Sequence, residues 1–339
     1  MRLTDGGKAA KRSSVDQLSA HLDRGWDLAQ KGDAAGANAC ARKALEIDPQ
    51  SPEVYNLLGY TAALLGEPDE ALDHYRQAIA LDETYFEAML NAAELLIPQG
   101  EWAEAVTLCD DAYDLAETDD ERTDALLMKV DALLGKSDQA EARNTMRLLP
   151  DGPHQNPQHS FLIGRFRYEL GDMDRAVAEL EEAIKTDPDH ADALYYLGLV
   201  REERGDRRGA TEVLLRARLA DMLVPPPPWS PTPETFGMMV QETIAKLAEP
   251  LLRLTTELEV YCVDVPGAEI VVDGVDPRAS ALYDAGVEDR PPRLFIYQRN
   301  LERVAGTLSD LQPAIQDAIV REITSAEQAA APIPSDQLN

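Results

Sequence analysis

The chain has 339 residues and a formal net charge of −30 at pH 7, from 62 acidic and 32 basic side chains. A surface this acidic repels nucleic acid and anionic lipid, so we exclude both and expect a protein partner with a basic surface. The three cysteines lie far apart without a CxxC pair, which excludes a disulfide framework and favours a reducing compartment, by default the cytoplasm.

The chain begins with a basic, polar segment, residues 1–14, for which we predict disorder. This segment lacks the apolar stretch of a secretory signal peptide. No part of the sequence approaches the ~18 consecutive apolar residues of a membrane-spanning helix, so we expect no membrane span.

Glycines then recur at a fixed interval of 34 residues. Two groups keep this interval: Gly32, Gly66 and Gly100, and then Gly171 and Gly205. Between the groups, Gly135 fits if one or two extra residues are allowed on either side. A repeat of this length is typical of a helix, a glycine turn and a second helix.

The second repeat shows why the pattern folds in this way. Gly66 supplies the turn that ends the first helix. The small residues Gly59 and Ala71 let the two helices approach closely, and Tyr75 packs the second helix against its neighbours. This pattern resembles the tetratricopeptide repeat family. The resemblance implies a mostly α fold, an α-solenoid of about six helix pairs over residues 15–222.

The fourth repeat, residues 121–154, matches the pattern weakly. Gly135 and Ala140 are kept, but Leu149-Pro150 is expected to break the second helix.

The family resemblance also implies a concave groove lined by the first helix of each pair. Aromatic rings and amides on such a groove suit an extended peptide or a helix. The positions that the family pattern places on the groove are Trp26, Asn56, Tyr60, Leu90, Asn91, Glu94, Phe161, Arg165 and Tyr195. The alternative is that several of them only pack against adjacent helices.

Acidic residues are concentrated in the middle of the array. Residues 51–200 hold 32 acidic and 10 basic side chains, a balance of −22. Such a balance favours an acidic groove that attracts a basic partner, although a charge run is also typical of a solvated face.

A proline-rich segment, residues 223–234, follows the array and cannot continue a helix. We interpret it as a stiff linker at a domain boundary. Beyond it, the patterns indicate a small α+β domain over residues 235–328 and a flexible tail over residues 329–339. The expected elements are a helix at 234–248, strands at 259–263, 269–272 and 293–297, and a helix at 311–330.

The stretch Arg293-Leu-Phe-Ile-Tyr-Gln-Arg-Asn-Leu-Glu-Arg303, followed by a long helix, resembles a small bacterial zincin-like metallopeptidase family. In that family the final helix carries His-Glu-x-x-His, in which two histidines hold zinc and the glutamate activates water. Here Glu322 matches the glutamate, whereas Arg321 and Ser325 replace both histidines. Because an arginine is a fixed cation, the resemblance implies a pseudoenzyme without a metal or cofactor. Glu322 is then expected to pair with Arg321 or another arginine.

Together these features predict a cytoplasmic adaptor or regulator. Its groove would bind a protein partner, for example a signalling protein such as a small GTPase or its regulator. The zincin-like domain would be either a second docking surface or a structural cap on the array. Two alternatives remain: a zinc-dependent metallopeptidase with a rearranged site, and a self-assembling scaffold. The oligomeric state is left open.

Overall fold

A computed structural model describes residues 5–150, 152, 154, 156–255, 258–286 and 291–330. The chain divides into two compact units, Met1–Arg175 and Ala176–Asn339. The division falls near the start of the second helix of the fifth repeat.

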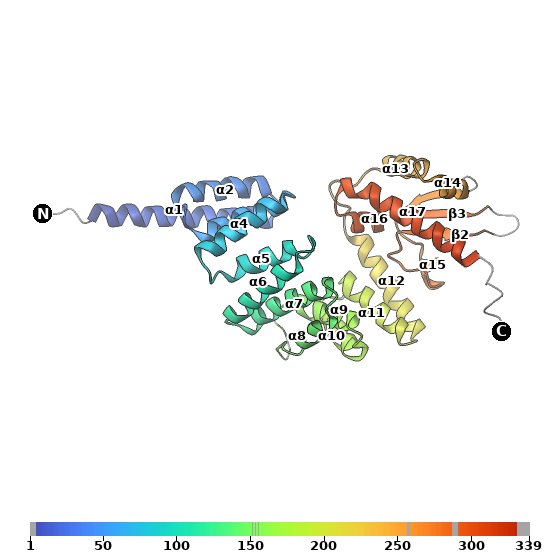
Figure 1. The fold of residues 1–339 in the computed structure, drawn as a ribbon, viewed down its shortest axis with the longest axis horizontal. Coiled ribbons are helices and arrows are strands. Elements are labelled where there is room, and N and C mark those ends of the chain that lie inside the picture. The colour runs from blue at the N-terminus through green and yellow to red at the C-terminus, as the bar shows by residue number, and fades with distance from the viewer. Residues whose placement is uncertain are drawn as a thin grey trace. The chain divides into compact units, whose positions relative to one another are not determined.

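The first unit is built from helix pairs (Figure 1). Its helices are α1 (Asp5–Gln30), α2 (Ala34–Ile47), α3 (Pro52–Leu64), α4 (Pro68–Leu81), α5 (Phe86–Leu96), α6 (Trp102–Leu115), α7 (Asp119–Gly135), α8 (Gln139–Thr145) and α9 (Pro157–Glu169). Consecutive helices from α1 to α8 pack against each other, and the first helices of the pairs, α1, α3, α5, α7 and α9, contact one another in succession. These first helices therefore share one surface. Helix α1 begins inside the segment for which we predicted disorder, and residues 1–4 lie outside the described residues.

The predicted glycine turns are confirmed. Gly32, Gly66, Gly100, Gly171 and Gly205 have φ angles between 76° and 84°. This left-handed backbone is open to glycine and costly for other residues, which explains why glycine recurs at the period of the repeat.

The prediction for the fourth turn was wrong. Gly135 is the last residue of α7, and Ser137 adopts the left-handed conformation instead, with a φ of 64°. A Cβ at Gly135 would lie 2.6 Å from Nε1 of Trp102, so the glycine is needed for close packing rather than for the turn. The second helix of this repeat is short as expected, with 7 residues in α8 against 14 each in α2, α4 and α6, but it ends at Thr145, before the predicted break at Leu149-Pro150.

The close approach predicted for the two helices of the second repeat is also confirmed. A Cβ at Gly59 would lie 2.5 Å from Cε1 of Tyr75. The Tyr75 ring is 2% exposed and belongs to a core cluster with Ala71 and Leu96. The sixth repeat keeps this arrangement, because a Cβ at Gly198 would lie 2.5 Å from Cδ2 of Leu214.

The second unit completes the array and adds a small sheet. Its elements, of which α10 starts three residues before the division, are α10 (Met173–Thr186), α11 (Ala191–Glu203), α12 (Arg207–Leu223), α13 (Pro233–Ala245), α14 (Glu249–Thr255), β1 (Glu259–Val263), α15 (Ala268–Val272), β2 (Ala281–Asp284), β3 (Arg293–Tyr297), α16 (Gln298–Ala305) and α17 (Leu308–Ala330). The strand order is β1-β3-β2, with β1 parallel and β2 antiparallel to β3.

Two helices cover one face of this sheet with apolar side chains. Leu294 and Ile296, two residues apart on β3, point to the same face and are fully buried. They form one core with Phe236 of α13 and with Ile315 and Ile319, which are one turn apart on α17.

Two of the three predicted strands, 259–263 and 293–297, are confirmed, but the prediction for residues 269–272 was wrong. These residues form the single-turn helix α15, which packs against α12. The N–H of Val271 donates to the carbonyl of Gly267 at 3.2 Å. β-branched residues favour strands only where a neighbouring strand offers a surface to pack against, and here α12 offers a helix instead.

The proline-rich segment packs onto the small sheet-containing region. The indole of Trp229 contacts the core of that region. Gln298 donates to the carbonyl of Pro231 at 2.8 Å, and the Ser230 hydroxyl donates to Glu302 at 2.6 Å. The segment is thus anchored at Trp229, Ser230 and Pro231.

Ion pairs join the last repeat to the same region. Asp221 of α12 is 7% exposed and accepts from Arg278 at 2.9 and 3.0 Å, and also from Arg303. A second carboxylate, Asp192 of α11, lies 2.8 Å from Arg278. The hydroxyl of Tyr195 donates to Asp276 at 2.8 Å. The last repeat and the C-terminal region therefore share a buried polar interface.

Candidate functional site

The shared surface of the first helices contains a cavity of about 520 Å³ in the first unit. Helices α5, α7 and α9 line it, together with the turn after α5. The lining residues are Leu90, Asn91, Glu94, Ile97, Pro98, Asp124, Leu127, Met128, Asp131, Leu162 and Phe166. We call this cavity the α5–α7–α9 groove. The groove offers apolar surface along its length with carboxylates beside it.

Three of the residues predicted for the groove, Leu90, Asn91 and Glu94, line this cavity. Glu94 is exposed, and within the described residues its carboxylate has no hydrogen bond or ion pair. Such a carboxylate is available to a cation on a partner.

Two further carboxylates in the groove have partners within the unit. Asp124 lies 2.7 Å from Nε2 of His159, whose side chain is 1% exposed. Asp131 lies 3.6 Å from Arg165, which also pairs with Glu169 at 2.7 Å. Arg165 was predicted to face the groove, and the structure places it beside the groove as a partner of acidic residues. The groove therefore has an acidic rim, and Arg165 partly compensates the negative charge of Asp131.

Asn56 and Asn91 are joined to each other. The Asn91 side-chain amide donates to Oδ1 of Asn56 at 2.9 Å, and Asn56 in turn donates to the hydroxyl of Tyr85 at 3.2 Å. Burial raises the pKa of Tyr85 to about 12, so the hydroxyl stays protonated. Because Asn56 is only 2% exposed, its role in this structure is to link α3 to α5.

The other predicted groove residues do not line this cavity. The half-buried rings of Trp26 and Tyr60 lie 5.2 Å apart, on α1 and α3. Phe161 on α9 is 5% exposed and belongs to the interior. Tyr195 lies in the second unit, where Arg278 sits 4.4 Å from its ring centre. Tyr195 is therefore part of the interface between the last repeat and the C-terminal region.

The residues that α7 contributes to the groove were missed by the sequence prediction. Predicted groove residues lie ten positions before the turn in the second, third, fifth and sixth repeats. They lie six positions before it in the first, second, third and fifth repeats. Counted from the true turn at Ser137, these offsets give Leu127 and Asp131, and both line the groove. The error at Gly135 therefore hid them.

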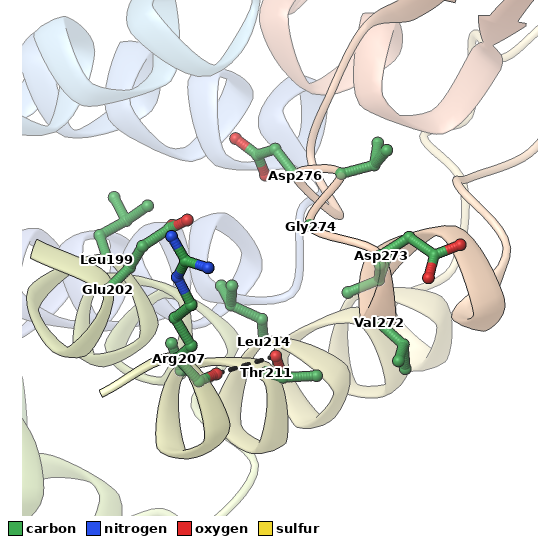
Figure 2. A pocket seen from close by; sticks show the side chains of 12 residues that line it. Leu199, Glu202, Arg207, Thr211, Leu214, Val272, Asp273, Gly274 and Asp276 are labelled. Atoms are coloured by element: carbon green, nitrogen blue, oxygen red, sulfur yellow. Dashed lines mark hydrogen bonds between the residues drawn. The ribbon is translucent and has the colours of Figure 1, made fainter. Parts of the chain in front are cut away.

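A second cavity, of about 440 Å³, lies within the second unit where α15 and the following turn face α11 and α12. Figure 2 shows Arg207 and Glu202 on one side of this cavity and Asp273 and Asp276 on the other. The hydroxyl of Thr211 donates to the Arg207 carbonyl at 2.9 Å (Figure 2). The side chains that line this cavity carry charges of both signs, so the cavity favours no single class of ligand.

The residues compared with the zincin-like motif, Arg321, Glu322 and Ser325, lie on α17. Arg321 and Ser325 are exposed. Glu322 accepts a hydrogen bond from the N–H of Tyr283 on β2 at 3.3 Å, whereas we expected an arginine partner. Among the described residues, no three His, Cys, Asp or Glu side chains are placed to hold a metal ion. In the part of the chain that the structure describes, no helix has the length and apolar character to cross a membrane.

Two stretches of the chain match known repeat families. Residues 52–85, which span α3 and α4, match the family described as "Tetratricopeptide repeat". Residues 164–205, from α9 to the end of α11, match the family described as "TPR repeat". The chain therefore contains tetratricopeptide repeats, as the sequence predicted.

Two curated proteins are similar to parts of the chain. The type IV pilus assembly protein PilF of Pseudomonas aeruginosa is 32% identical over 102 residues, which cover 30% of this chain and 38% of PilF. The probable biofilm formation methyltransferase WspC of Pseudomonas putida is 36% identical over 78 residues, 23% of this chain and 18% of WspC. The chain thus spans less than two fifths of the length of either relative.

Solved structures of repeat proteins share the fold. The structure of PilF from Pseudomonas aeruginosa superposes with a TM-score of 0.54 at 21% identity, over 61% of this chain and 93% of that chain. The structure of PilW, a type IV pilus biogenesis factor, gives a TM-score of 0.54 at 17% identity, over 61% and 94%. At this identity the likeness concerns the fold alone: a mostly helical repeat array.

Proposed function

We propose that the chain is a protein-binding adaptor whose α5–α7–α9 groove holds an extended or helical segment of another protein. The cavity of about 520 Å³ carries this proposal. It lies within the range of roughly 300–1,000 Å³ that is typical of ligand pockets. Its wall is mainly apolar, and the partly exposed side chains of Leu90, Met128 and Leu162 can receive apolar side chains of a partner.

The charges of the groove support a partner segment that also carries a basic residue. Glu94 is exposed at the groove, and Asp124 and Asp131 lie on the neighbouring helix. The chain as a whole carries a net charge of −30, so its field attracts positively charged partners over distance. A signalling protein, such as a small GTPase or its regulator, is one partner class that we propose on this basis.

Further support for an adaptor comes from the match to PilF, which is named as an assembly protein. Assembly factors act through contacts with other proteins. The compartment that we propose is the cytoplasm, where the exposed thiol of Cys262 would stay reduced.

For the C-terminal region we propose a structural cap on the last repeat. Its support is the buried interface formed by Asp221, Arg278 and Arg303. A degenerate zincin-like origin without catalysis is part of the same proposal, because Arg321 and Ser325 stand where that family has its zinc ligands.

The substitution Glu94→Lys is expected to weaken partner binding by roughly tenfold or more, since a charge-assisted hydrogen bond contributes about 1.5–3 kcal/mol. Tagged wild-type and variant proteins would be incubated with lysate of the source cells at low salt, and the recovered proteins quantified by mass spectrometry. A partner is defined as a protein whose recovery falls with Glu94→Lys.

Glu46→Lys is the matched control, because Glu46 is an exposed glutamate on the second helix α2. It changes the net charge equally and leaves the groove intact. Recovery that falls equally with both variants would show that net charge alone drives capture, and the groove proposal would fail.

A further inference from the structure

The early end of α8 leaves a second, smaller cavity in the first unit. It has a volume of about 200 Å³ and is lined by Arg143, Met146, Arg147, Arg167, Leu170, Asp172 and Arg175. Met146 and Arg147 directly follow α8, at the place where a full-length helix would continue. We call this cavity the arginine notch. Its lining residues come from α8, α9, the start of α10 and the turns that follow α8 and α9, and none of them lines the α5–α7–α9 groove.

The charge of the notch is opposite to that of its surroundings. Residues 51–200 contain 10 basic side chains against 32 acidic ones, and four of those 10 line this one cavity. Asp172 is the one acidic residue among the lining residues. Its carboxylate lies 3.7 Å from both Arg167 and Arg175.

The other two arginines are held by neutral groups. Arg143 donates to the backbone carbonyl of Leu170 at 3.0 Å and to the amide oxygen of Gln139 at 3.3 Å. Arg147 donates to the amide oxygen of Asn144 at 2.9 Å. Across residues 5–150, 152, 154, 156–255, 258–286 and 291–330, neither Arg143 nor Arg147 forms an ion pair with a carboxylate. Their positions are thus constrained, while no carboxylate of the described residues compensates their charges.

We propose that the arginine notch binds a phosphate-type dianion. Guanidinium groups offer paired donors that match the oxygens of a phosphoryl group, and two of the four around this cavity pair with no carboxylate among the described residues. A volume of about 200 Å³ is smaller than a pocket for a drug-sized ligand, so the notch takes a small group such as a phosphoryl. That group is either a free phosphate ion or the phosphoryl of a phosphorylated side chain.

The test is calorimetric titration of the full chain with sodium phosphate, against sodium chloride at equal ionic strength. Phosphate is expected to bind with a measurable heat that chloride does not give. The double variant Arg143→Gln, Arg147→Gln is expected to weaken binding at least tenfold, because two charge-assisted contacts are lost. A wild-type chain that shows no difference between phosphate and chloride would overturn the proposal.

Arg42→Gln is the matched control. Arg42 is an exposed arginine that donates to the amide of Asn38 at 3.1 Å, four residues away on its helix, much as Arg147 does to Asn144. Phosphate binding should be unchanged in this variant, and an equal loss in the control and in the double variant would refute a localised site.

A further titration separates the two sources of the dianion. A short peptide with one phosphoserine that binds at least tenfold more tightly than inorganic phosphate would identify a phosphorylated protein as the ligand. Equal affinities would identify free phosphate. In both cases the unphosphorylated peptide should not compete, and competition by it would contradict a phosphoryl site.

Discussion

Replacing Asp221 by alanine is expected to lower the stability of the unit Ala176–Asn339 by about 3–5 kcal/mol. Asp221 is 7% exposed, and its carboxylate binds Arg278, whose side chain is 11% exposed. Removing Asp221 leaves the buried Arg278 guanidinium with only the half-exposed Asp192 as an ionic partner, and the loss of the buried carboxylate accounts for most of the cost. The interface between α12 and the C-terminal region would then open more often.

The effect should be measured by native hydrogen exchange of the α12 amides, which reports the free energy of opening in the full chain. Asp192→Ala is the control, because Asp192 also binds Arg278 but is 47% exposed. Exposed pairs contribute about 0–1 kcal/mol. If Asp192→Ala and Asp221→Ala lower the protection of α12 equally, the proposed cap is not held by the buried pair.

The second large effect is expected at the contact between the two helices of the second repeat. Tyr75→Ala should lower the free energy of unfolding by about 3–5 kcal/mol, as for other large aromatic residues removed from a core. The Tyr75 ring is 2% exposed and lies directly over Gly59. Urea denaturation followed by circular dichroism measures this loss.

A double-mutant cycle with Gly59→Ala separates the contact from a general loss of core. In the wild-type chain, the added methyl would lie 2.5 Å from Cε1 of Tyr75, so Gly59→Ala should be destabilising by about 1–3 kcal/mol before its gain in helix propensity. In the Tyr75→Ala background the clash is absent, and the same change should stabilise by up to about 1 kcal/mol, the propensity of alanine over glycine. A Gly59→Ala effect of the same sign and size in both backgrounds would contradict the packing.

The repeat architecture was predictable because its turns require a backbone that favours one residue type. Gly66 and its counterparts have positive φ angles, so their spacing in the sequence reports the spacing of the helices. The fourth repeat shows the limit of this signal. A serine, Ser137, occupies the turn there, and Gly135 is kept for its contact with Trp102, so two different uses of glycine look alike in the sequence.

The groove was predictable to the extent that it follows the repeat. Leu90 and Glu94 were identified by their offsets from Gly100, whereas Leu127 and Asp131 were missed with the fourth turn. The interactions of Tyr195 could not be foreseen, since its partners, Asp276 and Arg278, come from 80 or more positions later in the chain.

The C-terminal region was harder to predict because its strands are short. β1 and β3 have five residues each and were identified from their β-branched and aromatic residues. β2 has only four residues, too few to show a periodicity, and α15 is a β-branched run that becomes a helix through its contact with α12. The arginine notch was not predicted, because it brings together residues of α8, α9, the start of α10 and the turns after α8 and α9.

The most direct test of the groove is site-specific photocrosslinking in the full chain. A photoreactive amino acid would replace Met128, which lines the groove, and in a parallel variant Glu46, which lies on α2 outside it. The partner defined by the Glu94→Lys comparison should crosslink from position 128 and not from position 46, through a segment that contains a basic residue. Crosslinking from position 46 alone, or equally from both positions, would show that the partner binds outside the groove.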